Sequence, residues 1–188
     1  AGIVRCSGRE ELTTVAGIFM YPELKGRNIA IVTHAGGPAV MLTDALSNGK
    51  LEVPHIEGPK AAELLGKLFP GSSVGNPIDF LATGTAEQLG YILDACENDF
   101  EEIDGIAVIF GSPGLFPIYA LLAEKIRTSK KPIFPIFPSY GWVKGEIEEF
   151  VRNGGVYFPD EVLFGNALAK VYNTPRVEPE DAQFPCVD

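Results

Sequence analysis

Residues 27–38 read Arg-Asn-Ile-Ala-Ile-Val-Thr-His-Ala-Gly-Gly-Pro, and this stretch decides the fold class. The apolar, β-branched run at 27–33 lacks the alternation of a half-exposed strand, which favours a strand buried on both faces. Glycines end the run, and Pro38 suits the first position of a helix over 38–48 that Asn48-Gly49 closes. The stretch therefore predicts a strand, a tight turn and a helix in succession.

The same alternation continues along the chain. It predicts further strands at 51–54, 103–110, 132–137 and 156–158, helices at 9–20, 59–69, 85–98, 116–129, 143–153 and 160–172, and a Gly/Pro-rich loop at 70–84. Each parallel crossover needs a helix on one face of the sheet. We therefore expect a flavodoxin-like, doubly wound α/β fold whose five-stranded parallel sheet has the order 2-1-3-4-5.

The composition excludes several classes of partner. The formal net charge is −10 and the isoelectric point is near 4.7, so the surface would repel nucleic acids and anionic membranes. No run approaches the ~18 apolar residues of a membrane span, and no signal peptide is recognisable. The spacing of Cys6, Cys96 and Cys186 matches neither a disulfide framework nor a zinc site. We expect a cytoplasmic protein without a metal site.

Ligands of doubly wound sheets bind outside the carboxyl ends of the strands, where the strand order reverses. The loop leaving the first strand there contains His34, Ala35, Gly36 and Gly37. Glycines let a backbone approach a ligand closely, and the N–H groups of a first helical turn attract an anion. The loop thus suits a phosphate or a carboxylate. A purely structural tight turn, with His34 as a polar residue at its rim, is the alternative interpretation.

Two further loops carry candidate ligand-binding residues. Residues 75–79, Gly-Asn-Pro-Ile-Asp, offer an amide and a carboxylate, which either bind a ligand or form an Asx-type turn before the next helix. Residues 111–114, Gly-Ser-Pro-Gly, leave the third strand and enter a helix. The candidates in these loops are Gly75, Asn76, Asp79, Gly111, Ser112 and Gly114.

Motifs for several common activities are absent. No Gly-x-x-x-x-Gly-Lys-Ser/Thr follows the first strand, which excludes a P-loop NTPase. No Gly-x-Gly-x-x-Gly follows a strand, so dinucleotide and flavin sites lose support. No Gly-x-Ser-x-Gly elbow occurs, and neither Ser112 nor Ser139 has a histidine nearby in sequence, which argues against a hydrolase.

Three ordered motifs resemble the NDP-forming acetyl-CoA synthetases of the succinyl-CoA synthetase superfamily. They are residues 26–38, then Ser-Val-Gly-Asn-Pro-Ile-Asp at 73–79, then Ile-Ala-Val-Ile-Phe-Gly-Ser-Pro at 106–113, with Lys-Lys-Pro at 130–132 after them. The chain is most similar to the second of the family's two flavodoxin-like ligase domains, over roughly residues 1–172. This resemblance implies a connector with a helix at 1–25, a ligase domain at 26–173, and an acidic linker or tail at 174–188. We interpret both ends as cut edges of a longer protein.

The resemblance also implies an activity for the whole enzyme. An acid, CoA and ATP would give acyl-CoA, ADP and phosphate through a phosphohistidine and an acyl phosphate. The phosphohistidine would lie in the preceding domain, because its Ser-His-Thr-Gly-like loop is absent from these 188 residues. No catalytic residue and no activity are therefore expected of this chain alone. A catalytically inactive binding or regulatory module, such as one fused to an acetyltransferase, is the alternative.

Site residues and partners follow from the same resemblance. His34, Ala35, Gly36 and Gly37 would bind the transferred phosphate, although the family usually has asparagine where His34 stands. The loops at 75–79 and 111–114 would lie beside the acyl substrate. This domain alone would bind no cofactor, whereas the whole enzyme would use ATP or ADP, magnesium, CoA and phosphate. The expected partners are CoA-binding and phosphohistidine domains and an ATP-grasp domain or subunit.

Overall fold

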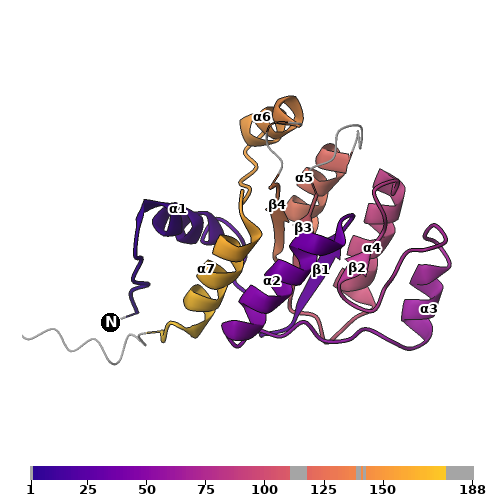
Figure 1. The fold of residues 1–188 in the computed structure, drawn as a ribbon, viewed down its shortest axis with the longest axis horizontal. Helices are drawn as coiled ribbons and strands as arrows, with labels where there is room; N and C mark the ends of the chain where they lie inside the picture. Colours follow the sequence, from indigo (N-terminus) through magenta and orange to yellow (C-terminus); the bar gives the residue numbers. More distant parts are fainter. Residues whose placement is uncertain (1, 111–117, 139–140, 142, 177–188) are drawn as a thin grey trace, which may run out of the picture.

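The computed structural model describes residues 2–110, 118–138, 141 and 143–176, which form a layered α/β fold (Figure 1). Its strands are β1 Ile29–Thr33, β2 Ile78–Asp79, β3 Gly105–Ile109 and β4 Ile133–Ile136. The helices are α1 Arg9–Ile18, α2 Gly36–Asn48, α3 Pro59–Leu65, α4 Ala86–Asn98, α5 Ile118–Thr128, α6 Lys144–Arg152 and α7 Glu161–Asn173. The strands pair in parallel in the order β2-β1-β3-β4.

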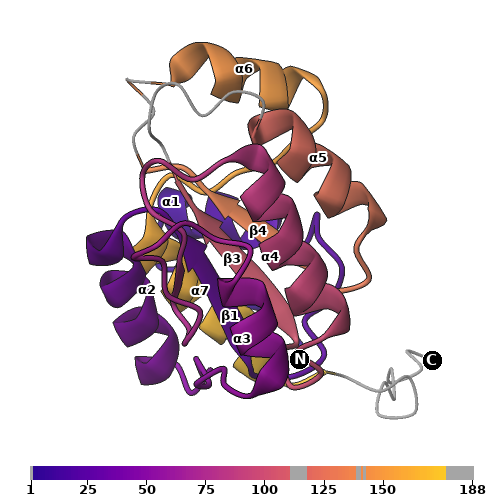
Figure 2. The ribbon, with the colours of Figure 1, turned by 90° about the vertical axis from the view of Figure 1, so that its right-hand side faces the viewer.

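Helices cover both faces of the sheet, as Figure 2 shows for α2 and α7 on one side and α4 and α5 on the other. Side chains of alternate β1 residues point to opposite faces of the sheet. Ile29 and Ile31 pack with α1, α2 and α7, whereas Ala30 and Val32 pack with the helices α3 to α6. All five β1 residues are fully buried, which explains why the run has no polar alternation.

The predicted parallel α/β fold is confirmed, but the five-stranded order is not. Residues 51–54 and 156–158 are not strands: each contributes one isolated bridge, Glu52 to Asn28 and Phe158 to Ile136. The second strand is instead Ile78–Asp79, inside the segment predicted as a loop. Pro54 has no N–H to continue a ladder, so the chain leaves the sheet after its bridge and returns at Ile78. Helix α2 also begins earlier than predicted, at Gly36.

The side chain of Asn76 completes the sheet edge between these two segments. Its Oδ1 accepts the N–H of Ile31 at 2.9 Å, and its Nδ2 donates to the carbonyls of Ile29 at 3.0 Å and Pro54 at 2.9 Å. The residue has φ 61°, a conformation that asparagine tolerates better than most residues, and a cis peptide bond follows it. The amide therefore substitutes for a strand neighbour along the edge of β1.

Close packing of α7 on α2 supports the helix that follows β1. A methyl group on Gly165 would lie 2.8 Å from the Ala45 Cβ and 3.0 Å from the Leu42 Cδ1, so only glycine fits this contact. Helix α1 packs on α7 from the other side, where Glu11 forms an ion pair with Lys170. None of the helices in the described ranges is both long enough and apolar enough to cross a membrane.

We expect Gly165→Ala to lower the free energy of unfolding by about 1–3 kcal/mol, because overpacking would push α7 away from α2. Gly90→Ala in α4 is the matched control, since its new methyl group would meet only the Leu121 Cδ2 at an ordinary 3.7 Å. Urea denaturation of the two variants measures the difference. Equal midpoints would show that the α2–α7 contact yields easily.

We expect Asn76→Asp to destabilise the chain by about 2 kcal/mol or more, because the carboxylate would face two carbonyl oxygens that now accept its N–H groups. Asn98→Asp is the control, because exposed Asn98 makes a single bond to the Asp94 carbonyl. Thermal unfolding of both variants at neutral pH tests the comparison. A midpoint for Asn76→Asp that matches the control would contradict the bridging role of the amide.

Candidate functional site

The carboxyl ends of β1, β2 and β3 bring several of the predicted site residues together. His34 directly follows β1, and Asp79 ends β2 in register with Thr33. Phe110 directly follows β3 and lies edge-on to the His34 ring, with centroids 6.2 Å apart. The strand order reverses here, since the chain visits β2 on one side of β1 and β3 on the other. The loop after β1 therefore lies where doubly wound folds carry their ligands.

Helix α2 begins at this edge with an uncapped amino terminus. Its N-cap residue Ala35 supplies no side-chain hydrogen bond, and its first turn contains no acidic residue. Helix geometry leaves the N–H groups of Gly36 and Gly37 without intrahelical partners, and Pro38 has no N–H. The Thr33 hydroxyl fixes the approach to the helix, because it accepts the Ala35 N–H at 3.0 Å and donates to the Ala35 carbonyl at 2.8 Å.

The described residues do not explain the two glycines at the start of α2. Neither Gly36 nor Gly37 has a positive φ, and a methyl group on either would meet no atom of a described residue within 4 Å. Steric demand within the described residues explains Gly165 but not this pair. The described residues therefore show no steric or conformational need for glycine at these two positions, and close approach by an external group stays a prediction.

His34 is partly buried between β2 and β3. Desolvation lowers the pKa of its imidazole below the ordinary value, and this outweighs the backbone of Ile109 and the carboxylate of Asp79, both of which raise that pKa. The ring is therefore mainly neutral at pH 7 and can donate one hydrogen bond and accept another.

The residues of the predicted loop at 75–79 lie at two different places in the structure. Asp79 lies at the carboxyl edge near His34, and its Oδ1 accepts the Leu81 N–H at 2.9 Å. Asn76 bonds instead to Ile29 and Ile31 farther down β1, and Gly75 packs against His55, whose Cε1 would lie 2.9 Å from an added methyl group. Gly75 and Asn76 thus support the sheet edge, while Asp79 belongs to the candidate site. Gly111, Ser112 and Gly114 lie outside the described residues.

Sequence reasoning missed an aromatic cluster behind the edge. The rings of Phe110, Tyr119 and Phe137 lie 5.1 to 5.3 Å apart between centroids. The buried hydroxyl of Tyr119 has no hydrogen-bond partner among the described residues. Only the spacing of Phe110 and Phe137 at the ends of two apolar strands hinted at this contact, and nothing in the sequence pointed to Tyr119.

Two grooves among the described residues lie away from this edge. One, of about 1040 Å³, separates the N-terminal segment from α7 and the end of α2, and the other, of about 1090 Å³, lies between residues 18–25 and the end of α7. The described ranges contain no group of three His, Cys, Asp or Glu side chains that could bind a metal ion. The described residues at the carboxyl edge supply backbone N–H groups, one imidazole and one carboxylate.

Three curated relatives share one activity. The alpha subunit of the ADP-forming acetate–CoA ligase II of Pyrococcus furiosus is 26% identical over 185 residues, which cover 94% of this chain and 40% of the relative. The ADP-forming acetate–CoA ligase of Methanocaldococcus jannaschii is 30% identical over 88 residues, or 46% of this chain and 12% of the relative. The ADP-forming acetate–CoA ligase I of Archaeoglobus fulgidus is 29% identical over 109 residues, which cover 58% of this chain and 16% of the relative.

Solved structures share the fold. A Pyrococcus horikoshii protein superposes with a TM-score of 0.79 at 23% identity and covers 90% of this chain and 41% of its own. An acetyl-coenzyme A synthetase of Candidatus Korarchaeum cryptofilum, in complex with phosphate and ADP, superposes with a TM-score of 0.77 at 17% identity. The match covers 91% of this chain and 38% of the synthetase chain. No protein-family model matches the chain.

The chain spans only about two fifths of the P. furiosus relative. The predicted resemblance is nevertheless confirmed: the homologues of this chain are ADP-forming acetyl-CoA synthetases.

Proposed function

We propose that this chain is a phosphate- and acid-binding ligase domain of an ADP-forming acyl-CoA synthetase. The complete enzyme would convert an acid, CoA and ATP into acyl-CoA, ADP and phosphate, through a phosphohistidine and an acyl phosphate. The relatives of this chain are named as ADP-forming acetate–CoA ligases, which supports the overall reaction. Nucleotide, magnesium and CoA would be bound mainly by CoA-binding, phosphohistidine and ATP-grasp domains or subunits outside these 188 residues.

One observation carries the assignment of the phosphate site. No atom of a described residue crowds Gly36 or Gly37, and neither residue has a positive φ that would require glycine. Both nevertheless present their N–H groups at the start of α2. The first turn of α2 contains no acidic residue to compete with an anion, which it shares with α3 and α5, whereas α1, α4, α6 and α7 each have one or two. These features favour a transferred phosphoryl group, whose charge fixed N–H dipoles stabilise.

The neighbouring side chains would orient the reactants. The backbone of Ile109 already bonds one nitrogen of the His34 ring, so the other nitrogen would donate to the phosphate in the imidazolium form, which a bound anion and the Asp79 carboxylate both favour. Gly111, Ser112 and Gly114 stay proposed acid-binding residues, because they follow Phe110 in the sequence and the Phe110 ring lies against His34. Asn76 would act indirectly, by holding β2 against β1 so that Asp79 stays at the edge.

The proposal divides the chemistry between this domain and others. His34 is not the phosphorylated residue in it, and the isolated chain should show no synthetase turnover. A complete enzyme that never forms a phosphohistidine would instead support an inactive acyl-CoA-synthetase-like module.

In the complete enzyme, we expect Gly37→Val to lower phosphorylation of the histidine by ATP by about 100-fold or more, because the branched side chain would block access to the N–H groups. Stability should change little, since the new side chain meets open space. Gly145→Val is the matched control: Gly145 is also the second residue of its helix, α6, and is equally open. Equal phosphorylation by both variants, or loss only in proportion to unfolding, would return Gly36 and Gly37 to a structural role.

In the isolated chain, we expect inorganic phosphate to raise the pKa of His34, because a bound anion favours the imidazolium. NMR titration of the ring in phosphate and in chloride of equal ionic strength measures the change. His55, which precedes α3 and lies against Gly75, serves as the reference resonance. Without phosphate, the pKa of His34 is lower in the folded chain than in the unfolded chain. The contribution of His34 to the free energy of unfolding is therefore fully present above the ordinary pKa of histidine, and it is lost as the pH falls through the lowered pKa of the folded chain.

Asp79→Asn provides a second measurement on the same ring. Its amide oxygen can still accept the Leu81 N–H, but the charge that raises the His34 pKa is removed. The His34 pKa should therefore fall further in this variant. If phosphate leaves the His34 pKa of the unsubstituted chain unchanged, the isolated chain has no anion site next to His34. This result would hold whatever activity the complete enzyme shows.

A further inference from the structure

We propose that the acidic segment 177–188 of this chain docks in the groove of about 1040 Å³ between the N-terminal segment and α7, where its carboxylates meet side-chain N–H donors. The groove reaches the last residue of α2, Asn48, whereas the proposed phosphate site lies at the first, Gly36. A helix of 13 residues is roughly 20 Å long, so the two sites are separate. Docking in this groove is therefore independent of the proposed phosphate site.

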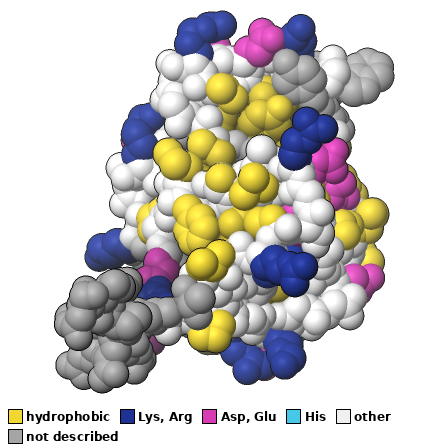
Figure 3. Space-filling model, turned by 90° about the vertical axis from the view of Figure 1, so that its left-hand side faces the viewer, with side chains coloured by type: hydrophobic (Ala, Val, Ile, Leu, Met, Phe, Trp, Pro, Cys, Tyr) yellow, Lys and Arg dark blue, Asp and Glu magenta, His cyan; other side chains and the backbone are white. Residues whose placement is uncertain are grey.

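The lining of the groove is cationic and polar. It includes Arg5 and Lys170, and none of the described residues that line it is Asp or Glu, although the whole chain has 25 acidic and 15 basic side chains. Figure 3 shows the side of the molecule with α1 and the N-terminal segment, where Lys and Arg cover more of the surface than Asp and Glu. The groove would therefore attract an anionic group to a protein whose net charge repels anions.

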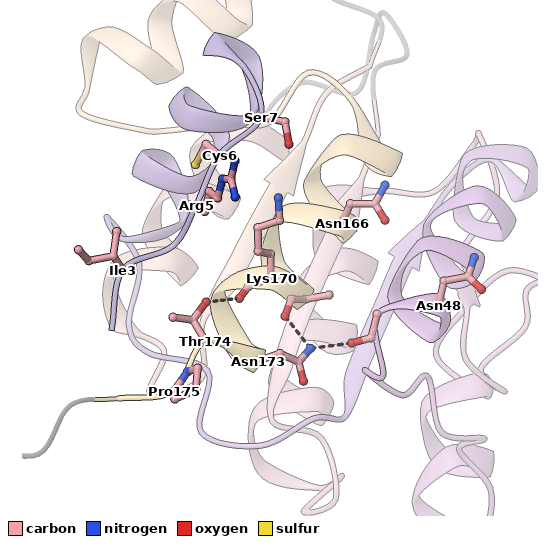
Figure 4. Close-up of a pocket in the computed structure, with 12 residues that line it drawn as sticks. Ile3, Arg5, Cys6, Ser7, Asn48, Asn166, Lys170, Asn173, Thr174 and Pro175 are labelled. Carbon is pink, nitrogen blue, oxygen red and sulfur yellow. Dashed lines mark hydrogen bonds between the residues drawn. The ribbon is translucent and has the colours of Figure 1, made fainter. Parts of the chain in front are cut away.

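Three side chains of the lining are available to a ligand. Figure 4 shows Arg5, Asn48 and Asn166 around the groove, and none of them makes a side-chain hydrogen bond or an ion pair with another described residue. Lys170 is already paired with Glu11, so Arg5 supplies the charge that lacks a counterion in the lining. A guanidinium and two amides can together bind carboxylates through several hydrogen bonds.

The sequence that follows the groove supplies the matching charge. Thr174 and Pro175 line the groove, and residues 177–188 come next, with four carboxylates and no Lys or Arg. Three of these carboxylates lie within 178–181, Glu-Pro-Glu-Asp. The first of them, Glu178, is three residues beyond Pro175, a distance that an extended chain covers in about 10 Å. The carboxylates can therefore reach the lining without any movement of α7.

Tethering favours this segment over a second copy of the chain. A second copy is also acidic, but its carboxylates would meet the groove only at the concentration of the protein. A segment joined to the wall of the groove has an effective concentration of about millimolar. Because a single exposed ion pair stabilises little, the tether and the clustering of three carboxylates in four residues decide the occupant.

Neutralising the segment in the 188-residue chain tests the proposal. A triple variant removes the three clustered charges and keeps the length of the segment: Glu178→Gln, Glu180→Gln and Asp181→Asn. A control variant removes three exposed charges elsewhere: Glu101→Gln, Glu124→Gln and Glu149→Gln. The triple variant should shift the side-chain amide NMR signals of Asn48 and Asn166, and the control should shift neither. Unchanged signals in the triple variant, or equal shifts in both variants, would overturn the proposal.

Thiol crosslinking distinguishes the chain's own segment from that of a second copy. Cys6 lines the groove and Cys186 belongs to the segment. Cys96 is fully buried, and burial raises the pKa of its thiol to about 12, so it stays unreactive. Dibromobimane should join Cys6 to Cys186 within one chain, with a yield about 10-fold above that of the triple variant, since three exposed charge contacts together amount to about that factor.

The crosslinked product gives a second decision. Equal yields in the unsubstituted chain and the triple variant would overturn docking by charge. A product with the mass of two chains would overturn the proposal in favour of exchange of the segment between copies. Neither readout depends on synthetase activity, so failure of the docking and failure of the proposed function are distinguishable.

Discussion

The structure depends on the burial of β1 between two sheet neighbours and two helical layers. Every residue from Ile29 to Thr33 is fully buried, so each backbone group of this strand needs a partner inside the protein. β3 satisfies one edge along the whole strand. The other edge is assembled from three pieces: the bridge to Glu52, the amide of Asn76, and the short strand β2.

This edge links the sheet to the candidate site. Because Ile78 and Asp79 pair with Val32 and Thr33, the carboxylate of Asp79 arrives at the same level as His34. On the other side, the register of β1 with β3 brings Phe110 against the His34 ring. The hydrogen bonds of Asn76 therefore bear on the geometry of the candidate site several residues away, because they tie the segment that leads into the short strand with Asp79 to β1.

The sequence predicted the features that extend over many residues. Apolar periodicity located the helices and the long strands β1, β3 and β4, and the strand order placed the loop after β1 at the point of reversal. It could not predict β2, because two residues show no period, or the bridging amide of Asn76, because its partners are 22 to 47 positions away. The open space around Gly36 and Gly37 depends on where other elements are absent, which no local pattern encodes.

Two features of the described residues have no explanation among them. The start of α2 exposes helix N–H groups that the side chain of the N-cap residue Ala35 does not cap, and the outer face of α1 exposes apolar groups that no described helix covers. Both are unfavourable for a domain that acts alone, since one leaves donors without fixed acceptors and the other leaves apolar surface in water. The two features differ in chemistry, since one is a set of N–H donors that an anion would satisfy and the other is apolar surface that only another apolar surface would cover. In the function proposed above, the N–H groups of α2 would receive the transferred phosphoryl group, and this role leaves the apolar surface of α1 unexplained.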